Sequence, residues 1–184
     1  MQVVDTSCES AMSSSKHPSV RFLKNLPKYP TPKRSHERVK LIVQGDVEQP
    51  LKLSLKELRS FPTIKLSEDF RCLEGWTVKD VLWEGIPIPY ITQATGAKKS
   101  SKFLLFRAGK YTYTMKMKTA LENNAILALK QSGKWLTSTH GGPVRLVFNR
   151  HDCYEGVKWV DRIELLTKQA EDTAERIALS RIRT

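Results

Sequence analysis

Apolar and polar residues along this chain follow two periods, and the two-residue period of a half-buried strand dominates. Residues 39–43 alternate and end at a Gly45-Asp46 turn, which predicts a strand. Two hairpins are predicted where apolar runs flank turn residues: 102–106 and 111–115 around Ala108-Gly109-Lys110, and 126–129 before Gln131-Ser132-Gly133-Lys134. Residues 144–148 and 157–165 are further predicted strands, and 63–71 should be extended and deliver Cys72 at a strand end.

Helical signals are short and lie between these runs. Two capping-box patterns each open a short predicted helix: Ser54-Leu55-Lys56-Glu57, ending before Pro62, and Thr77-Val78-Lys79-Asp80, running toward Trp83. A third short helix is predicted at 89–95, closed by Gly96, and a terminal helix at 168–182. The predicted fold class is therefore α+β, a mixed strand-rich domain with short peripheral helices.

The length and the proline pattern bound the domain organisation. A chain of 184 residues is long enough for one compact domain and too short for two ordinary domains with linkers. Its start contains a Ser13-Ser14-Ser15 run and repeated prolines, at Pro18, Pro27, Pro30 and Pro32. Prolines at that density exclude regular helix and a central strand. We expect a basic Pro/Ser-rich arm over 1–38, disordered at its start or extended over the domain, and a single folded domain over 39–184.

The chain has a large positive charge, but the distribution of that charge does not indicate a nucleic-acid-binding protein. The chain has 31 Lys and Arg against 19 Asp and Glu, a formal net charge of +12, which favours binding of polyanions. However, the cations are scattered, and no run interleaves them with the aromatic residues of an RNA-binding sheet. The pattern favours a basic solvated surface over specific nucleic-acid binding, and part of the charge could surround an anionic cofactor or substrate.

Cysteine usage and hydropathy indicate the compartment. The three cysteines, Cys8, Cys72 and Cys153, have no CxxC spacing, so neither a disulfide framework nor a zinc site is expected. This set fits a reducing compartment. The N-terminus has no apolar stretch of signal-peptide length, and no apolar run is long enough to span a bilayer. We expect a cytoplasmic protein without membrane insertion.

Two segments carry chemical information: Asp69-Phe70-Arg71-Cys72-Leu73-Glu74-Gly75-Trp76 and His140-Gly141-Gly142-Pro143-Val144-Arg145. The thiolate of Cys72 is a soft ligand that suits a high-valent metal. His140 and Arg145 offer donors for phosphate oxygens, and the glycines between them permit close backbone approach. Together the two segments indicate a cofactor enzyme, whereas Cys72 alone would favour a buried free cysteine that packs as a small apolar side chain.

These segments resemble the sulfite oxidase family of molybdopterin-binding oxidoreductases. The cysteine segment continues into Val81-Leu82-Trp83-Glu84-Gly85-Ile86-Pro87-Ile88, which is similar to the family's sequence after its cysteine. Segment 140–145, and Val157-Lys158-Trp159-Val160 with Ile163-Glu164-Leu165, are similar to its later pterin-binding segments, in the expected order. The resemblance runs from about residue 39 to 166 and implies the sulfite-oxidase-like molybdopterin-binding fold.

The resemblance also implies roles for individual residues. Cys72 would be the single protein ligand to molybdenum in a molybdenum–molybdopterin cofactor, and Glu74 would orient a substrate or tune a proton near the metal. The implied cofactor-binding residues are Arg71, Cys72, His140, Gly141, Arg145, Lys158 and Trp159. Each role has a structural alternative: an ion pair with Arg71 for Glu74, a solvated strand position for Lys158, and core packing for Trp159.

Two departures from the family pattern bear on the substrate. Sulfite-oxidising members follow the cysteine with an arginine-bearing segment, whereas this chain has a carboxylate at Glu74 that would repel sulfite. The Arg-Cys-x-Glu-x-Trp pattern is more similar to the branch that contains the catalytic subunit of the bacterial protein-methionine-sulfoxide reductase. The later segment lacks a proline after its strand and has Glu155 in place of a lysine, which leaves the roles of Glu155, Arg150 and His151 open.

The resemblance therefore implies a molybdenum-cofactor oxidoreductase that transfers an oxygen atom to or from a small sulfur or nitrogen compound. Reduction of an S-oxide or N-oxide is expected ahead of sulfite oxidation. The sequence has no CxxCH haem motif and no Rossmann glycine fingerprint, so electrons should come from a separate electron-transfer protein or donor. The alternatives are a catalytically inactive basic binding module of the same fold and a molybdopterin carrier.

Overall fold

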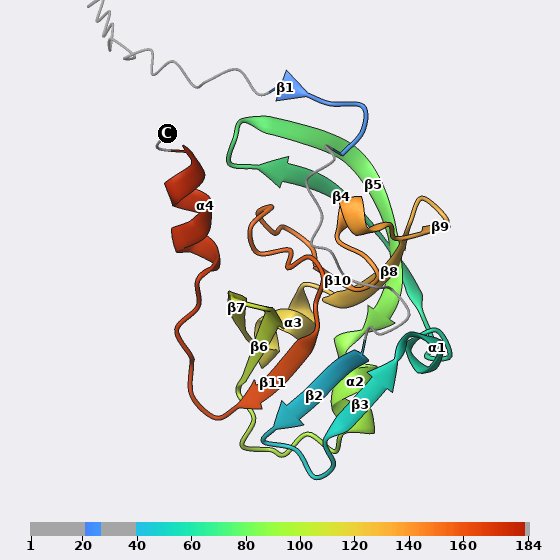
Figure 1. Cartoon of the computed structure of the whole chain (residues 1–184), viewed down its shortest axis with the longest axis vertical. Coiled ribbons are helices and arrows are strands. Elements are labelled where there is room, and N and C mark those ends of the chain that lie inside the picture. The colour runs from blue at the N-terminus through green and yellow to red at the C-terminus, as the bar shows by residue number, and fades with distance from the viewer. Residues whose placement is uncertain (1–20, 27–39, 183–184) are drawn as a thin grey trace, which may run out of the picture.

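The computed structural model describes residues 21–26 and 40–182, so most of the predicted arm 1–38 lies outside the described residues (Figure 1). The described residues form two sheets. Sheet A contains β1 (Arg21–Phe22), β4 (Ile64–Cys72), β5 (Trp76–Pro87), β8 (Ile126–Gln131), β9 (Lys134–Trp135) and β10 (Arg145–Val147). Sheet B contains β2 (Lys40–Gly45), β3 (Leu51–Ser54), β6 (Phe103–Ala108), β7 (Tyr111–Lys116) and β11 (Arg162–Leu166).

Short helices connect or follow these strands: α1 (Leu55–Leu58), α2 (Ile88–Ala94), α3 (Met117–Glu122), α4 (Ala174–Ile182) and the 3-10 turn η2 (Ser138–His140). The strand order is β1-β5-β8-β10 in sheet A, where β4 also pairs with β5 and β9 with β8. In sheet B the order is β3-β2-β11-β6-β7. The predicted α+β class with short helices is confirmed, as are the capping box of α1 and both predicted hairpins.

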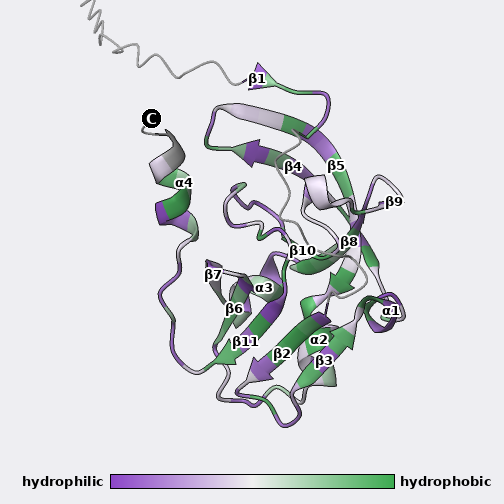
Figure 2. Cartoon of the chain, in the orientation of Figure 1, coloured by the Kyte–Doolittle hydropathy of each residue, from purple (hydrophilic) through white to green (hydrophobic). Residues whose placement is uncertain are grey.

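The central strand β8 shows how the core is built. Leu127 and Leu129 belong to an apolar cluster that contains residues from both sheets, whereas Ile126 and Ala128 belong to a second cluster with Phe70, on β4. Successive side chains of a strand point to opposite faces, so β8 is buried on both of its faces. Its continuous apolar run, green in Figure 2, follows from that position. The second cluster lies under the residues of interest for function.

The helix predicted from Thr77 toward Trp83 is wrong, because these residues lie in β5. The buried Val78 and Val81 are three residues apart, a spacing that imitates a helix. In the structure both join the second apolar cluster, because β5 has one more residue between them than β4 has between their pairing partners. The extra residue makes a β-bulge, which restores the burial of both valines on one face.

A carboxylate closes this bulge. Asp80 has a φ of 51°, in the left-handed region. The Asp69 carboxylate, on β4, accepts a hydrogen bond from the Asp80 backbone N–H at 3.2 Å and another from Lys79 Nζ at 2.5 Å. These two bonds and the Lys79 charge lower the pKa of Asp69. The Asp80 N–H, which makes no backbone hydrogen bond between the strands at the bulge, is therefore satisfied by the Asp69 side chain.

Other elements differ in extent from the prediction. The strand predicted at 157–165 begins only at Arg162, and the terminal helix predicted at 168–182 begins only at Ala174. Before that helix, Asp172 and Thr173 accept hydrogen bonds from backbone N–H groups of β7, at 2.9 Å and 3.0 Å. This segment is held against the edge of sheet B, and edge strands are commonly covered in this way. Strand β3 and helix α3 were not predicted.

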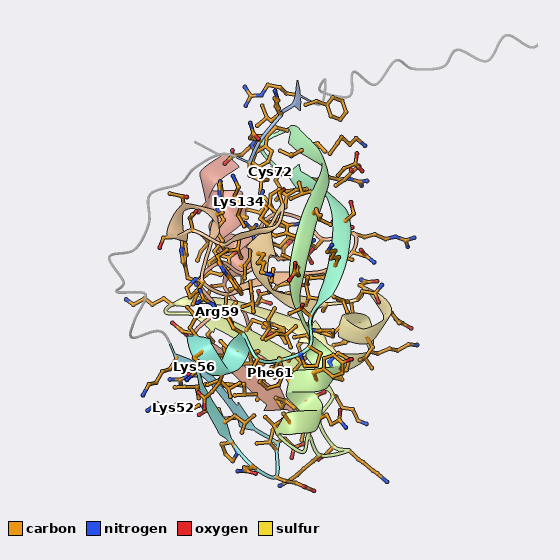
Figure 3. All side chains as sticks on the ribbon, turned by 90° about the vertical axis from the view of Figure 1, so that its right-hand side faces the viewer. Lys52, Lys56, Arg59, Phe61, Cys72 and Lys134 are labelled. Atoms are coloured by element: carbon orange, nitrogen blue, oxygen red, sulfur yellow. The ribbon has the colours of Figure 1, made fainter. Side chains whose placement is uncertain are left out.

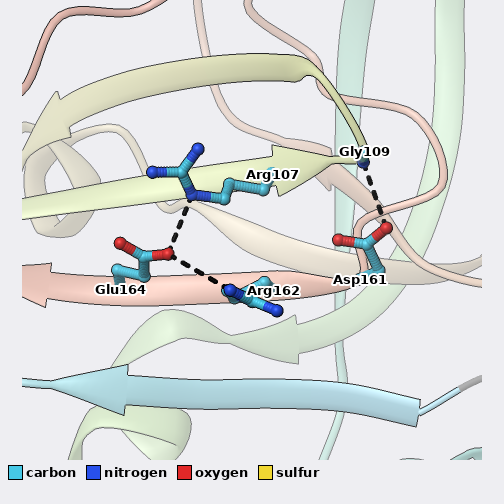
Figure 4. A network of polar contacts seen from close by, with 5 residues as sticks. All are labelled: Arg107, Gly109, Asp161, Arg162 and Glu164. Carbon is cyan, nitrogen blue, oxygen red and sulfur yellow. Dashed lines mark hydrogen bonds and ion pairs between the residues drawn. The ribbon is translucent and has the colours of Figure 1, made fainter.

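Sheet B contains a charged network on paired strands (Figure 4). Arg162 on β11 lies directly opposite Arg107 on β6, which places two like charges side by side. Glu164 accepts from Arg107 Nε at 2.8 Å and lies 3.9 Å from the Arg162 guanidinium. Asp161 accepts from the Gly109 N–H at 3.1 Å, in the turn between β6 and β7. Glu164 offsets the repulsion between the two arginines, and Asp161 attaches the turn of the hairpin to the start of β11.

Candidate functional site

Cys72 is the last residue of β4, as predicted, and its side chain is half-buried. It packs against the second apolar cluster. The turn that follows returns the chain into β5, with Gly75 at a φ of 80° and its N–H donating to the Cys72 carbonyl at 3.0 Å. Within residues 21–26 and 40–182, and apart from the chain neighbours of Gly75, no atom lies within 4 Å of the position that a Cβ on Gly75 would take. The thiol is therefore fixed at the end of a paired strand, beside a turn with open space over its glycine.

A second thiol lies next to Cys72, and sequence reasoning missed it. Cys153 Sγ is 3.0 Å from Cys72 Sγ, although the two residues are 81 positions apart. A parallel β-bridge between Arg71 and Asp152 brings their segments together. Residues 72 and 153 each follow a bridge residue, so they are neighbours across the two segments. The spacing of the cysteines along the chain carries no signal of this contact.

The two thiols share their protons. The interaction with the Cys153 sulfur and burial raise the pKa of Cys72, whereas hydrogen bonding with Cys72 lowers the pKa of Cys153 to about 7. A proton held between two sulfurs makes the first deprotonation easier and the second harder. One thiolate at this position is therefore accessible near neutral pH, and two together are disfavoured.

Glu155 holds the loop that carries Cys153. Its carboxylate accepts from Tyr113 Oη at 2.7 Å and from the Asp152 backbone N–H at 2.8 Å. Burial and this hydrogen bond raise the pKa of Tyr113, which keeps the phenol protonated as a donor. Tyr111 Oη donates to the Tyr154 carbonyl in the same loop. Glu155, one of the residues whose role the sequence left open, thus fixes the loop to β7.

The later predicted residues form a second group. Trp159 donates its backbone N–H to the Gly141 carbonyl at 2.8 Å, and its Nε1 donates to the Ser138 carbonyl at 2.8 Å. Gly141 has a φ of 89°, and a Cβ there would lie 2.7 Å from Lys158 Cγ. The structure thus brings Gly141, Lys158 and Trp159 into direct contact. The need for glycine at 141 arises from the Lys158 side chain and the backbone conformation.

Arg145 connects the two groups. Its side chain is buried, with 1% exposure, and its NH1 donates to the His140 carbonyl at 3.2 Å. The guanidinium lies over the rings of Phe70 and Trp83, 4.8 Å and 5.1 Å from their centroids. Phe70 precedes Cys72 by two positions on β4. A single buried cation is therefore stacked on the strand that presents the thiol.

Two ring nitrogens near Arg145 have no hydrogen-bond partner among the described residues, Trp83 Nε1 and His151 Nε2. Both side chains are buried, and both rings pack on Phe70. Burial and the Arg145 charge lower the pKa of His151 to about 4, so it is neutral at pH 7. Buried donors are nearly always satisfied in folded proteins. A polar group that entered this layer would find an indole N–H and a guanidinium.

Other predicted residues lie apart from this layer. Arg71 and Glu74 are exposed, and the Glu74 carboxylate accepts from Trp76 Nε1 at 3.1 Å. Arg150 is also exposed, and its backbone N–H donates to the Glu68 carboxylate at 2.8 Å. Figure 3 shows Cys72 toward one end of the molecule, with the exposed cations Lys134, Arg59 and Lys52 at successive heights toward the other. The positive charge is spread along this side.

The donors at this site fit a cofactor better than a bare ion. In residues 21–26 and 40–182, no group of three or more His, Cys, Asp or Glu side chains could hold a metal ion. The half-buried thiol of Cys72 offers one soft ligand. The buried cation Arg145 and the half-buried Lys158 offer positive charge for an anionic group. This donor set suits a metal that brings most of its ligands in an anionic organic cofactor. In the same part of the chain, no helix is both long and apolar enough to cross a membrane.

Comparison with known proteins places the chain in a described family. The family model described as an oxidoreductase molybdopterin binding domain matches residues 28–174. An uncharacterised oxidoreductase of Bacillus subtilis, YuiH, is 29% identical over 125 residues, which cover 67% of this chain and 63% of that protein. The protein-methionine-sulfoxide reductase catalytic subunit MsrP of Campylobacter jejuni is 26% identical over 159 residues, covering 77% of this chain and 53% of the relative.

The fold has a counterpart among solved structures. The sulfane dehydrogenase SoxCD from Paracoccus pantotrophus superimposes with a TM-score of 0.71 over 78% of this chain and 42% of that chain, at 22% identity. At this identity the likeness concerns the fold alone. The present chain spans less than two thirds of the curated relatives it matches, 63% of the Bacillus protein and 53% of the Campylobacter protein.

Proposed function

Because the chain belongs to the oxidoreductase molybdopterin-binding domain family, we propose that it is a molybdenum-cofactor oxidoreductase that reduces an S-oxide or N-oxide of a small molecule. The observation that carries the proposal is the half-buried Cys72 thiol at the end of β4, two residues after Phe70, on whose ring the buried Arg145 stacks. A soft ligand at the end of β4 and a buried cation stacked on the same strand match a metal bound to an anionic organic cofactor.

Individual side chains have separate tasks in this proposal. Cys72 holds the metal, and the bound cofactor supplies two-electron oxygen-atom transfer chemistry. Arg145 and Lys158 bind the anionic end of the cofactor, and His140 supports Arg145 through its carbonyl, which accepts at 3.2 Å. Gly141 leaves room for the Lys158 side chain, because a Cβ at position 141 would lie 2.7 Å from Lys158 Cγ. The chain thus orients the cofactor from two segments far apart in sequence.

Glu74 is the proposed proton-handling and specificity residue. It lies two positions after Cys72, is exposed, and is oriented by Trp76 Nε1, which donates to its carboxylate at 3.1 Å. A carboxylate this near Cys72 disfavours a dianionic substrate such as sulfite through repulsion, and it can exchange a proton with a neutral oxide. The similarity to proteins named as methionine-sulfoxide reductase subunits supports the S-oxide direction. Electrons come from a separate protein or donor.

The test compares metal and pterin content in three purified proteins. Wild type should contain near-stoichiometric molybdenum, measured by elemental analysis, and pterin, measured by fluorescence after oxidation. Cys72→Ser should lose the molybdenum, because a serine hydroxyl is a poor ligand for a soft site. Cys153→Ser is the matched control, since it removes the neighbouring thiol, 3.0 Å away, and should keep the metal.

The other outcomes are equally specific. Pterin without molybdenum in wild type would favour the cofactor carrier. Neither component, in a host that makes the cofactor, would favour the basic binding module. If the metal is present, S-oxides, N-oxides and sulfite are then assayed with a redox dye. Turnover of sulfite alone would contradict the proposed direction.

A further inference from the structure

We propose that Cys72 and Cys153 form a reversible intramolecular disulfide when the protein lacks its metal, so that Cys153 controls whether Cys72 is available as a ligand. Formation of the disulfide follows from the geometry of the two thiols alone. Its competition with metal binding rests on the proposed function. Cys153 is not needed by that function, and apart from its contact with Cys72 its side chain packs against the second apolar cluster.

The distance between the two sulfurs carries the proposal. They lie 3.0 Å apart, and a disulfide needs a separation of about 2.05 Å, so each side chain has to move by well under one bond length. The backbone is also suitable. The Arg71–Asp152 bridge immediately before the cysteines sets neighbouring segments about 4.8 Å apart, inside the range of about 4.4–6.8 Å between the Cα atoms of bridged cysteines.

Besides the bridge that joins them, each segment has contacts of its own that hold it in place. Cys72 ends β4, which pairs with β5 along most of its length. The Cys153 loop is held by Glu155 through Tyr113 Oη at 2.7 Å and the Asp152 N–H at 2.8 Å. The two thiols are therefore pre-positioned, and the protein does not have to order a loop before the bond forms. Both side chains are half-buried, so a small oxidant can reach them.

Hydrogen peroxide is the oxidant that the step requires. One thiolate attacks an oxygen of hydrogen peroxide, the O–O bond breaks, and a sulfenic acid and a hydroxide form; the hydroxide takes up the proton that the thiol lost and leaves as water. The second thiol then attacks the sulfenic sulfur, and its proton leaves with the hydroxyl group as a second water. In total two thiols lose two electrons and two protons, one S–S bond forms, and one peroxide becomes two waters. A dithiol reductant reverses the change by exchange.

The disulfide and the metal site exclude each other. A thiolate is the form of cysteine that binds metals, and a disulfide sulfur has no charge to donate. Conversely, a Cys72 sulfur bound to a metal cannot attack an oxidant or a sulfenic acid. Formation of the disulfide would therefore protect Cys72 of the metal-free protein from irreversible oxidation, because reduction restores the thiols. Until that reduction, the disulfide would block binding of the metal.

The test uses the full chain in a Cys8→Ser background, so that only two thiols remain. Metal-free protein, made in a host that lacks the pterin cofactor, is treated with hydrogen peroxide, alkylated without reduction and digested with trypsin. Cleavage after Arg71, Lys79, Arg150 and Lys158 gives peptides 72–79 and 151–158. We expect these two peptides to be recovered as one linked species, lighter than their sum by two hydrogen atoms and separated by dithiothreitol.

Variants and the loaded protein complete the test. Cys153→Ser should give no linked species, and its Cys72 should oxidise to sulfinic acid, which dithiothreitol does not reverse. Protein loaded with the molybdenum cofactor should resist linkage under the same peroxide treatment. Molybdenum uptake by the oxidised protein should be low until dithiothreitol is added.

The possible failures are distinguishable. Free, alkylated Cys72 and Cys153 after peroxide treatment would overturn the disulfide, and so would linkage only between separate molecules. Linkage in the metal-free protein together with equal linkage in the loaded protein would leave the disulfide standing. That result would overturn the competition with the metal and the role of Cys72 as its ligand.

Discussion

His151 has an imidazole with 2% exposure, packed between the rings of Phe70 and Phe148 at centroid distances of 5.7 Å and 4.9 Å. Its Nδ1 forms a hydrogen bond with the Phe148 carbonyl. The nearby Arg145 charge lowers the pKa of the imidazole. Burial and that charge both disfavour the imidazolium. Sequence could not place His151, whereas the structure makes it a neutral residue in the layer beneath the candidate site.

The first prediction concerns the pH dependence of stability that this residue causes. The pKa of His151 is lowered from 6.5 to about 4, so the unfolded chain takes up a proton at a higher pH than the folded protein does. The stability of the folded protein is therefore unaffected by this group above pH 6.5, and it falls as the pH is lowered toward 4. We expect this group to reduce the free energy of unfolding by up to about 3 kcal/mol across that window.

Urea unfolding at several pH values between 7 and 4 measures this slope in wild type and in His151→Gln, which has no titrating ring. The variant should be less stable at pH 7, because its packing on Phe70 changes, but its stability should fall less steeply with decreasing pH. Equal slopes in the two proteins would mean that another group causes the acid sensitivity.

At the scale of elements, the bulge in β5 decides where the apolar residues point. Val78 and Val81 both reach the second apolar cluster, although three residues separate them, because Asp80 leaves the strand ladder. The Asp69 carboxylate accepts a hydrogen bond from the Asp80 backbone N–H at 3.2 Å. A regular strand would turn one of the two valines to the opposite face. The bulge therefore allows β4 and β5 to extend as a continuous hairpin to Cys72.

The second prediction tests this geometry at Asp80, whose φ is 51°. Asp80→Gly should leave stability unchanged or raise it by up to about 1 kcal/mol, because glycine adopts the left-handed region without a steric penalty. Asp80→Val should lower stability by about 1–2 kcal/mol, because a β-branched side chain is strained there. Guanidinium unfolding of both variants gives the two differences, and equal effects in one direction would contradict the assigned conformation.

At the scale of the whole molecule, contacts between distant segments build the site. Cys72 and Cys153 are 81 positions apart, and Arg145 reaches β4 from another strand of the same sheet. Cross-linking the two cysteines would close a long loop and remove conformational freedom from the unfolded chain. The chain-entropy model gives an upper limit of about 4.5 kcal/mol for a loop of this length.

The third prediction follows from this loop. Oxidised metal-free protein should unfold at a higher guanidinium concentration than reduced protein, with a difference in free energy of at most about 4.5 kcal/mol. Cys153→Ser should show no difference between oxidising and reducing conditions, which controls for effects of the oxidant elsewhere. A lower midpoint on oxidation would indicate that the bond strains the β4 end or the Cys153 loop.

The sequence by itself determined the strand-rich α+β class, the hairpins, the capped helix α1 and the position of Cys72 at a strand end. These features depend on local periodicity, turn residues and capping groups, which act over a few neighbouring residues. The same local reasoning gave a helix at 77–83, because a bulge inside a strand produces helical spacing of apolar residues. The wrongly predicted helix and the correctly predicted strands therefore both come from reading the spacing of apolar residues over short segments.

Only the tertiary structure decided which distant residues meet. Cys153 lies beside Cys72 because a β-bridge pairs their segments, and Glu155 serves the loop because Tyr113 reaches it from β7. Arg145, on β10, stacks on Phe70, on β4, although β8 and β5 separate these two strands in the order of sheet A. Pairing of remote strands depends on the packing of the entire chain. The local sequence around two such residues therefore does not predict that they will be in contact.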